Sequence, residues 1–298
     1  MTYGGIEAGG TKWVCAVGSS PDDVRETVTI PTTTPDETIA RAAAFFSEQV
    51  DLLAIGVGSF GPLDLRPDSA TFGHITTTPK AGWSDTDLVG QLEGALGIPV
   101  AIDTDVNVAA LAEHRFGAAN GLSTFCYITV GTGIGGGVFA NGALVHGLVH
   151  PEIGHMRIPH DRALDPFDGV CPFHGDCLEG LASGEAIRAR FGVGADELLD
   201  AAAWELVAGY LALGLVNVSC ALSPERIVIG GGVMNEPRLL PAIRRRVGEL
   251  LAGYLDVPRL GDDLDQYVVA PELGDRAGIV GALELAERSL SAEPQTYA

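Results

Sequence analysis

The chain has 298 residues, of which 46% are hydrophobic and 40 are glycine, and this composition excludes a disordered or low-complexity protein. The formal net charge is −21, which excludes a surface for nucleic acid or anionic membranes, because no basic patch is available to neutralise phosphates. The apolar runs are short and interrupted, and the N-terminus begins with a strand-like segment, so we expect a cytoplasmic protein with no transmembrane segment. The chain has five cysteines, and we expect no disulfide framework among them.

The first part of the chain alternates between strand and helix patterns. Gly9 and Gly10 separate two apolar runs, which is a hairpin signal. The stretch 59–83 is rich in glycine, proline and threonine and lacks a helical period, so we expect a functional loop region there. The expected elements are strands over 3–7, 11–17, 24–30, 52–57 and 100–102 and helices over 36–49, 86–96 and 105–116.

The same hairpin pattern recurs in the second part of the chain. A strand over 125–130, a turn at 131–133 and a return strand over 135–139 repeat the opening unit. This recurrence predicts two related α/β lobes, and the lack of a linker between them predicts a cleft rather than two independent modules. The later expected elements are helices over 201–220, 237–255 and 275–288 and a strand over 227–229 that runs into three glycines.

The segment 150–183 has the pattern of a zinc site. His155 is followed by Cys171, His174 and Cys177, and two thiolates with two imidazoles satisfy tetrahedral zinc. Because all four ligand positions are filled by the protein, we expect the metal to be structural. Folding around it would bring two carboxylates near one another, where they could hydrogen-bond a polyol; these are Glu152 and Glu179. The alternative is that these cysteines are ordinary buried thiols and the histidines ordinary loop residues.

Three glycine-rich turns each follow an apolar strand, and they lie at 7–12, 131–137 and 230–233. Glycine lets the backbone approach a phosphate closely, and threonine hydroxyls can add to the amide donors. Each turn alone could be a plain turn, and none matches the P-loop or dinucleotide pattern. The set of three favours nucleotide binding.

Asp103 and Asp105 lie at a strand-to-helix junction, beside Thr104 and Asn107. One of these residues is expected to cap the helix, because aspartate and asparagine are favoured there. Two aspartates are more than a cap needs, and in an α/β lobe this position opens onto the ligand crevice. The pattern therefore favours a general base at this junction.

Together these motifs resemble the ROK family of sugar kinases, within the actin and hexokinase-like ATPase superfamily. The resemblance covers nearly the whole chain and is closest to the bacterial fructokinase branch. The stretches that carry it are Gly5–Lys12, Asp103–Asn107, Val130–Gly137, His150–His155 and Cys171–Gly184, with Thr78-Pro79-Lys80 followed by Gly82-Trp83.

The resemblance implies a two-lobed α/β fold of the actin-like or ribonuclease H-like ATPase class, with a cleft between the lobes and a small zinc-binding subdomain. It also implies an ATP-dependent fructokinase that makes fructose 6-phosphate with Mg²⁺. The expected domains are an N-terminal lobe over 1–118, completed by the C-terminal helix at about 275–298, and a larger lobe over 119–274 that holds the zinc segment.

The resemblance assigns a role to each matching position. Asp105 matches the catalytic base, and His155 can bind zinc through one ring nitrogen and the sugar through the other. The sugar positions are Gly61, Thr104, Asp105, Glu152, His155 and Glu179. The ATP positions are Gly9, Gly10, Thr11, Lys12, Gly131, Thr132, Gly133, Gly135, Gly231 and Gly232. The zinc positions are His155, Cys171, His174 and Cys177.

Two positions bear on the choice of sugar. Many family members carry aspartate where this chain has Glu7, and the glucose-specific members carry asparagine where it has Thr104. Both differences favour fructose or mannose over glucose. The alternatives are a broader hexose kinase for mannose or glucose, and a ROK-type sugar sensor without catalysis. The sensor is disfavoured because the family's regulators carry an N-terminal helix-turn-helix and this chain is strongly acidic. The family suggests a homodimer.

Overall fold

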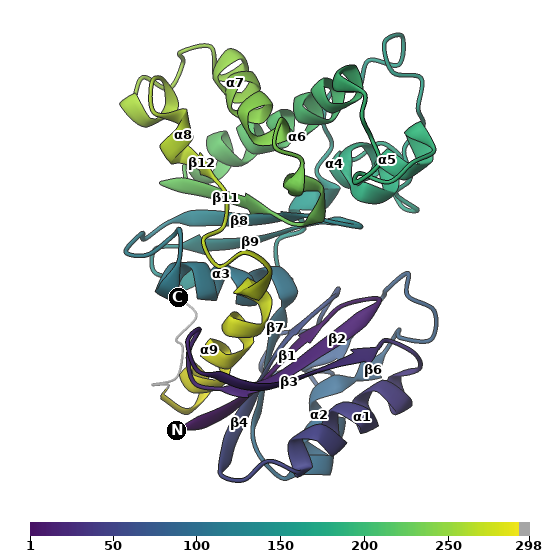
Figure 1. Cartoon of the computed structure of the whole chain (residues 1–298), viewed down its shortest axis with the longest axis vertical. Helices are drawn as coiled ribbons and strands as arrows, with labels where there is room; N and C mark the ends of the chain where they lie inside the picture. Colours follow the sequence, from purple (N-terminus) through teal and green to yellow (C-terminus); the bar gives the residue numbers. More distant parts are fainter. Residues whose placement is uncertain (292–298) are drawn as a thin grey trace. The chain divides into compact units, whose positions relative to one another are not determined.

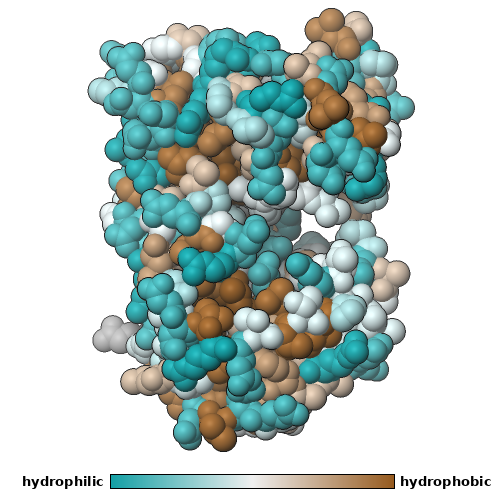
Figure 2. Space-filling model, in the orientation of Figure 1, coloured by the Kyte–Doolittle hydropathy of each residue, from teal (hydrophilic) through white to brown (hydrophobic). Residues whose placement is uncertain are grey.

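The computed structural model describes residues 1–291, and within it the chain forms two compact units (Figure 1). Unit 1 contains Met1–Asn120, the short segment Val145–His150 and the described part of the C-terminal segment that begins at Asp275. Unit 2 contains Gly121–Leu144 and Pro151–Gly274. In each unit Figure 2 shows hydrophilic side chains over much of the visible face, with hydrophobic ones interspersed.

Unit 1 is built on a five-stranded sheet in the order β3-β2-β1-β4-β7. The antiparallel hairpin of β1 and β2 follows from the paired glycines between them, and β4 and β7 then add parallel to β1. A small second sheet pairs β5 with β6. The strands are β1 (Thr2–Ala8), β2 (Lys12–Gly18), β3 (Val24–Pro31), β4 (Leu52–Ser59), β5 (His74–Ile75), β6 (Thr86–Asp87) and β7 (Val100–Thr104).

Helices cover both faces of this mixed sheet, in which two strand pairs are antiparallel and two are parallel. Helices α1 (Pro35–Ser47) and α2 (Leu88–Leu96) pack on one side; α3 (Asp105–Phe116) and α9 (Ala277–Ser291), with η4 (Gly274–Arg276) before it, lie on the other (Figure 1). The alternation along β1 reflects this arrangement. A side chain at Gly4 would meet Phe46 of α1, whereas one at Gly5 would meet Leu283 of α9.

Gly56 marks the closest approach of α9 to the sheet, because a Cβ there would clash with the Ala282 carbonyl oxygen. Gly56→Ala should therefore lower the free energy of unfolding by about 1–3 kcal/mol or more. Gly94→Ala is the matched control: this glycine lies exposed within α2, where a Cβ meets nothing within 4 Å, and alanine should raise stability by about 0.5–1 kcal/mol. Urea denaturation of both variants tests the pair, and similar stabilities for both would contradict the packing assignment.

Unit 2 repeats the strand order of unit 1. Its five-stranded sheet runs β10-β9-β8-β11-β12, with an antiparallel hairpin of β8 and β9 followed by parallel β11 and β12. The repetition predicted from the two glycine hairpins is therefore present. The strands are β8 (Phe125–Val130), β9 (Ile134–Ala140), β10 (Ala143–Leu144), β11 (Arg226–Gly230) and β12 (Val268–Val269).

The central helix of unit 2 is α6 (Ala201–Leu222), which packs against α4 and α7. Trp204, Leu211 and Leu215 are among its buried side chains. By length and composition alone this helix could cross a membrane, whereas we expected no such segment from the sequence. Half of its most apolar stretch is buried within the protein. The other helices are η1 (Ile153–His155), α4 (Leu178–Ala182), α5 (Gly184–Phe191), η2 (Gly232–Asn235), α7 (Leu239–Leu251), η3 (Pro258–Leu260) and α8 (Leu264–Tyr267).

The predicted limits of the domains stay a prediction, but the compact units differ from them at residues 119–120, which belong to unit 1, and at one longer segment. Val145–His150 belongs to unit 1, whereas the prediction placed it in the larger lobe. The physical reason is that His146 lies against Asp103 and His150 against the amide of Leu63. Residues 292–298 of the predicted terminal helix lie outside the described residues.

Candidate functional site

The predicted site residues of unit 1 gather at the carboxyl ends of its parallel strands. The register pairs Ala8 of β1 with Ser59 of β4, and Ser59 with Thr104 of β7. Three loops therefore leave the sheet at the same edge: the first glycine turn, the turn that contains Gly61, and the start of α3 with Asp105. This edge is where α/β sheets place ligands.

Asp105 is the first residue of α3, and its Oδ1 accepts a hydrogen bond from the Val106 amide at 2.9 Å. Burial nevertheless raises the pKa of Asp105 to about 6. The pKa of Glu7 is raised as well, mainly by burial and to a smaller extent by the negative charge of Asp105. The positive charge of Lys12 partly offsets this rise. A carboxylate with a raised pKa at a strand end is suited to accept a proton near neutral pH.

Thr104 and Asp103 hold the start of α3 in place. The Thr104 hydroxyl oxygen caps the helix by accepting from the Asn107 amide at 3.2 Å, so the cap that the sequence suggested is Thr104. Asp103 is buried and accepts from the Asn107 side chain at 2.7 Å, while His146 Nε2 lies 2.9 Å from its other oxygen. Asp103 is thus a support beneath Asp105 rather than a second group at the strand end.

The first glycine turn has its carbonyl oxygens occupied from within unit 1. Gly9 O accepts from the Thr32 hydroxyl at 2.7 Å, and Gly10 O accepts from Lys80 Nζ at 2.5 Å. Thr11 O accepts from the Thr32 amide at 3.0 Å. Within the described part of the chain, the amides of Gly10 and Thr11 donate to no acceptor. Consecutive free amides on a turn with tied carbonyls are suited to donate hydrogen bonds to an anion.

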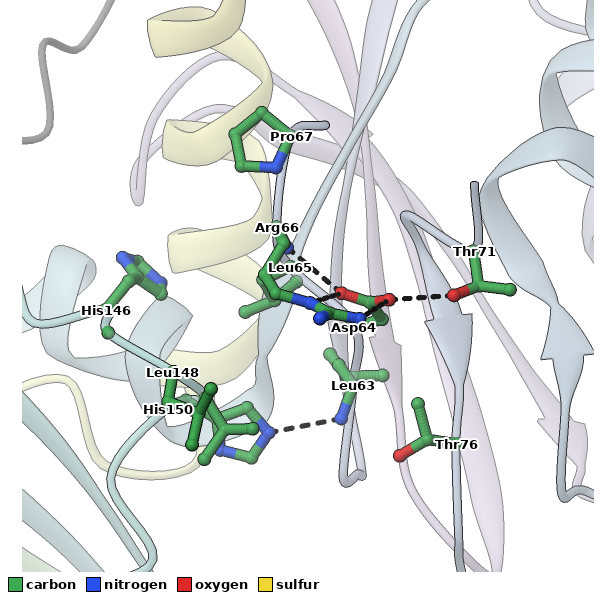
Figure 3. Close-up of a pocket in the computed structure, with 12 residues that line it drawn as sticks. Leu63, Asp64, Leu65, Arg66, Pro67, Thr71, Thr76, His146, Leu148 and His150 are labelled. Carbon is green, nitrogen blue, oxygen red and sulfur yellow. Dashed lines mark hydrogen bonds and ion pairs between the residues drawn. The ribbon is translucent and has the colours of Figure 1, made fainter. Parts of the chain in front are cut away.

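The turn that contains Gly61 is fixed by His150. Its Nε2 accepts a hydrogen bond from the Leu63 amide at 3.1 Å, and a Cβ at Gly61 would lie 3.5 Å from the same nitrogen. Figure 3 shows this contact at the edge of a cavity of about 530 Å³ that is lined by residues 63–67 and 146–150 together with Thr71 and Thr76. The Arg66 hydrogen bond holds the pKa of Asp64 well below its usual range, so this carboxylate stays ionised and stabilises the turn.

The second glycine turn, in unit 2, has the same construction as the first. Gly131 O accepts from the Gly184 amide at 2.8 Å, Thr132 O from the Glu185 amide at 3.3 Å, and Gly133 O from the Gly131 amide at 2.9 Å. The amides of Thr132 and Gly133 donate to no acceptor among the residues that the structure describes. Each unit therefore presents one pair of free amides at the end of its first hairpin strand.

The third glycine turn lies beside the second. Gly231 has a φ of 95°, and a Cβ there would lie 2.5 Å from Val130 O, so this position requires glycine. Gly232 begins the short helix η2 directly after it. Sequence-distant turns at 131–133 and 231–232 thus form one continuous edge of the unit 2 sheet.

Glu179, a predicted sugar residue, lies against the second turn. Its Oε2 accepts from the Ile134 amide at 2.9 Å, and a Cβ at Gly133 would lie 2.6 Å from that oxygen. It is the second residue of α4, and Cys177 immediately precedes this helix. Glu152 precedes the 3-10 helix that ends with His155, whose amide donates to the Glu152 carbonyl oxygen at 3.0 Å. Glu152 thus lies directly before the short helix that carries His155, and Glu179 lies in the helix that directly follows Cys177.

The His/Cys segment brings the four predicted ligands together. Their donor atoms all lie within 4.8 Å of one another, and they are His155, Cys171, His174 and Cys177. Cys171 Sγ lies 3.6 Å from Nδ1 of each histidine, and Cys177 Sγ lies 3.7 Å from Nδ1 of His155. Tetrahedral zinc with bonds of about 2.3 Å to sulfur and 2.0–2.1 Å to nitrogen gives a sulfur-to-nitrogen distance of about 3.6 Å. The donor set and its dimensions therefore fit a zinc ion.

Charged neighbours hold the loop between these ligands. Asp176 accepts from Arg162 at 3.0 Å and lies 2.7 Å from Arg157, while His160 Nδ1 lies 3.3 Å from it. Hydrogen bonding to His160 lowers the pKa of Asp176. His146 and His160 each have a carboxylate partner that the sequence did not indicate. Single histidines without a spacing pattern carried no signal for these pairs.

The chain matches the model of the ROK family over residues 3–289. A fructokinase of Zymomonas mobilis subsp. mobilis is 46% identical over 95% of this chain and 96% of its own length. A fructokinase of Pediococcus pentosaceus is 43% identical over 97% of this chain and 99% of its own. The crystal structure of a ROK family glucokinase from Streptomyces griseus in complex with glucose and AMPPNP matches with a TM-score of 0.77 and 28% identity, over 96% and 99% of the two chains.

The repeated sheet and these matches define a two-lobed α/β protein of the actin-like ATPase class, which confirms the predicted fold class. The chain belongs to the ROK family, as the resemblance of its motifs indicated.

Proposed function

We propose that this protein is an ATP-dependent fructokinase that transfers the γ-phosphoryl group of ATP to fructose and forms fructose 6-phosphate. The single observation that carries the proposal is Asp105, a carboxylate with a pKa raised to about 6 at the ligand edge of the unit 1 sheet. The fructokinase names of relatives at 46% and 43% identity, against 28% for the glucokinase, favour fructose over glucose.

In this proposal Asp105 accepts the proton of the attacking sugar hydroxyl. Such a base contributes about 10²–10⁴-fold to the rate. The helix cap at Thr104 and the bonds from Asn107 to Asp103 fix the backbone that carries it. In unit 1 the free amides of Gly10 and Thr11 offer hydrogen-bond donors to phosphate oxygens of ATP. In unit 2 the free amides of Thr132 and Gly133 offer the same kind of donor, and Gly231 and Gly232 form the adenosine-side turn. Mg²⁺ bound to ATP would neutralise part of the phosphate charge.

The proposed sugar-binding residues of unit 1 are Gly61 and Thr104, together with Asp105. Those of unit 2 are Glu152, His155 and Glu179. His155 has its Nδ1 toward the thiols, which leaves Nε2 for the sugar, and the ion held by the cluster is zinc. The four ligands would hold zinc between η1 and the start of α4, where the metal would supply a fixed cross-link that keeps the sugar residues of unit 2 in place.

Steady-state assays of ADP release with Mg-ATP test the choice of sugar. The proposal predicts the highest kcat/KM for fructose among fructose, mannose, glucose and N-acetylmannosamine. A higher kcat/KM for mannose or glucose would establish the broader hexose kinase instead. Turnover with none of the four sugars, combined with tight sugar binding in calorimetry, would establish the sensor.

The pKa of Asp105 predicts the acid limb of the activity. Below pH 6 the carboxyl group becomes protonated in the free enzyme and can no longer accept a proton, so kcat/KM for fructose should fall about tenfold for each pH unit. Above pH 7 the base is ionised and this limb should be flat. The pH profile between 4.5 and 8 checks it, with Mg-ATP kept saturating; constant activity down to pH 5 would contradict the assignment.

We further propose that the enzyme is a cytoplasmic homodimer. One support is a groove of about 1020 Å³ on unit 2, in which α6 presents an apolar stripe at helical spacing: Ala202, Leu206, Gly209 and Leu213. Leu164 and Leu250 add exposed apolar surface at its edges. Light scattering should give twice the chain mass for the wild type and the monomer mass for Leu213→Glu. A monomeric wild type at micromolar concentration would contradict the dimer.

A further inference from the structure

The chain has two lysines, Lys12 and Lys80, and both lie at the first glycine turn. Lys12 follows the turn directly in the sequence, whereas Lys80 reaches it from the loop 76–83 and donates from Nζ to Gly10 O at 2.5 Å. We propose that Lys80 is a further ATP-binding residue, whose ammonium group holds the Gly10 carbonyl and contacts the phosphate chain. This inference rests on the proposed function and adds a residue to its phosphate site.

The backbone of Lys80 is held by the core of unit 1. The Trp83 amide donates to Lys80 O at 3.2 Å, and the Lys80 amide donates to the Thr78 hydroxyl oxygen at 3.3 Å. Trp83 is fully buried; its ring centroid lies 5.7 Å from that of Trp13, and its Nε1 donates to the Thr33 carbonyl oxygen at 2.9 Å. The lysine therefore starts from a fixed turn, which lowers the entropic cost of placing its ammonium group.

The bond to Gly10 leaves the ammonium group with donors for a ligand. An ammonium group has three N–H donors, and Gly10 O takes one of them. The open side of the turn is at the same residue, since a Cβ at Gly10 would meet nothing within 4 Å. Phosphate oxygens that accept from the free amides of Gly10 and Thr11 would thus lie within reach of Lys80.

The carboxylates near the first glycine turn make the positive charge of Lys80 important for phosphate binding. Glu7, Asp105 and Asp275 bring negative charge to the same region of unit 1, because the latter two raise the pKa of Glu7. The whole chain carries −21. A polyphosphate that approaches the turn is repelled by these carboxylates, and nearby cations must offset the repulsion. Lys80 meets this need in addition to Lys12.

The alternative role for Lys80 is a purely structural one, in which its bond only closes the turn. A structural lysine would change stability when replaced, and Lys80→Gln, which keeps a donor for Gly10 O, would bind polyphosphate like the wild type. A phosphate-binding lysine would lose polyphosphate affinity in Lys80→Gln, because the positive charge is gone, and adenosine would bind as before. The phosphate chain alone, as inorganic tripolyphosphate, therefore separates the two roles.

The test is isothermal titration of Mg-ATP, inorganic tripolyphosphate and adenosine into full-length wild type, Lys80→Met, Lys80→Arg and Arg41→Met. Arg41 on α1 is the control for the loss of one surface charge, since its ion pair with Glu37 is long at 3.7 Å and exposed. We expect Lys80→Met to lower the affinity for Mg-ATP and tripolyphosphate about tenfold or more and to leave the affinity for adenosine unchanged. Lys80→Arg should stay within about threefold of the wild type, because it keeps the charge and donors, and Arg41→Met should match the wild type.

The proposal is overturned if Lys80→Met binds tripolyphosphate like the wild type, or if it weakens adenosine to the same degree. Lys80→Gln, which keeps a donor without the charge, is titrated in the same way and must give the same tenfold loss for tripolyphosphate; wild-type affinity in Lys80→Gln would establish the structural role. Turnover of fructose by the wild type is measured in the same preparation. Its absence would remove the fructokinase assignment, whereas the titrations would still decide the role of Lys80.

Discussion

Asp105→Asn should lower kcat for fructose phosphorylation by about 10²–10⁴-fold, because an amide cannot accept the proton of the attacking hydroxyl. The asparagine oxygen can still accept from the Val106 amide, so the start of α3 should keep its structure. Fructose and Mg-ATP should bind with nearly unchanged affinity. Steady-state kinetics and calorimetry of the same variant measure both quantities.

The same substitution should not destabilise the protein. The pKa of Asp105 is raised from its usual value to about 6, so ionisation of this carboxyl group lowers the free energy of unfolding at pH 7. This loss of stability disappears as pH falls through 6. A neutral asparagine avoids the loss, and we expect the free energy of unfolding to rise by about 1–3 kcal/mol at pH 7. Below about pH 4 the gain should vanish, because the carboxyl group is then neutral in both the folded and the unfolded chain.

Asp87→Asn is the matched control for this variant. Asp87 caps α2 by accepting from the Gly90 amide at 2.8 Å, and asparagine is an equally good cap. It should leave both kcat and stability near those of the wild type. Unchanged turnover in Asp105→Asn would exclude Asp105 as the base, whatever the stability result.

Cys171→Ser should remove the metal and lower the free energy of unfolding by more than about 4 kcal/mol, because the binding energy of a structural zinc is folding energy. Cys171 is buried, and its sulfur faces Nδ1 of both histidines at 3.6 Å, so serine leaves the cluster with Cys177 as its single thiolate ligand. The loss of the cross-link should also raise KM for fructose by releasing Glu152 and Glu179. Elemental analysis, calorimetric melting and sugar kinetics measure the three effects.

Cys220→Ser serves as the control, because Cys220 is an exposed free thiol at the end of α6. We expect about one zinc per chain in the wild type and in Cys220→Ser, and less than a tenth of that in Cys171→Ser. Full fructose turnover by a wild type stripped of metal with a chelator would contradict a zinc that positions the sugar residues.

Sequence reasoning predicted the parts of the fold that follow from short-range pattern. The hairpins around Gly9-Gly10 and residues 131–133 and the long helices lie where the apolar periodicity placed them, and the strand repeat appears as identical strand order in both sheets. The short strands β5, β6, β10 and β12 and the helices α4, α5 and α8 were missed, because two to eight residues are too few for a periodic signal.

The site shows a similar division. The His/Cys set was predictable because zinc ligands have a recognisable spacing, and its four donors do come together. Two contacts were not predictable, because they join residues far apart in the sequence. His146 contacts Asp103, beneath Asp105, across 43 positions, and Lys80 contacts Gly10 across 70 positions. Only the folded chain shows that the carbonyls of both glycine turns are tied while neighbouring amides stay free.

The reaction proposed for this chain, transfer of the terminal phosphoryl group of ATP to fructose, can be observed in its product. Purified protein is incubated with Mg-ATP and fructose, and the sugar product is identified by phosphorus NMR. We expect one new phosphomonoester at carbon 6 of fructose, formed by the wild type and Asp87→Asn and reduced at least 100-fold in Asp105→Asn. ATP that stays intact in the presence of fructose, or a product that Asp105→Asn forms at the wild-type rate, would contradict it.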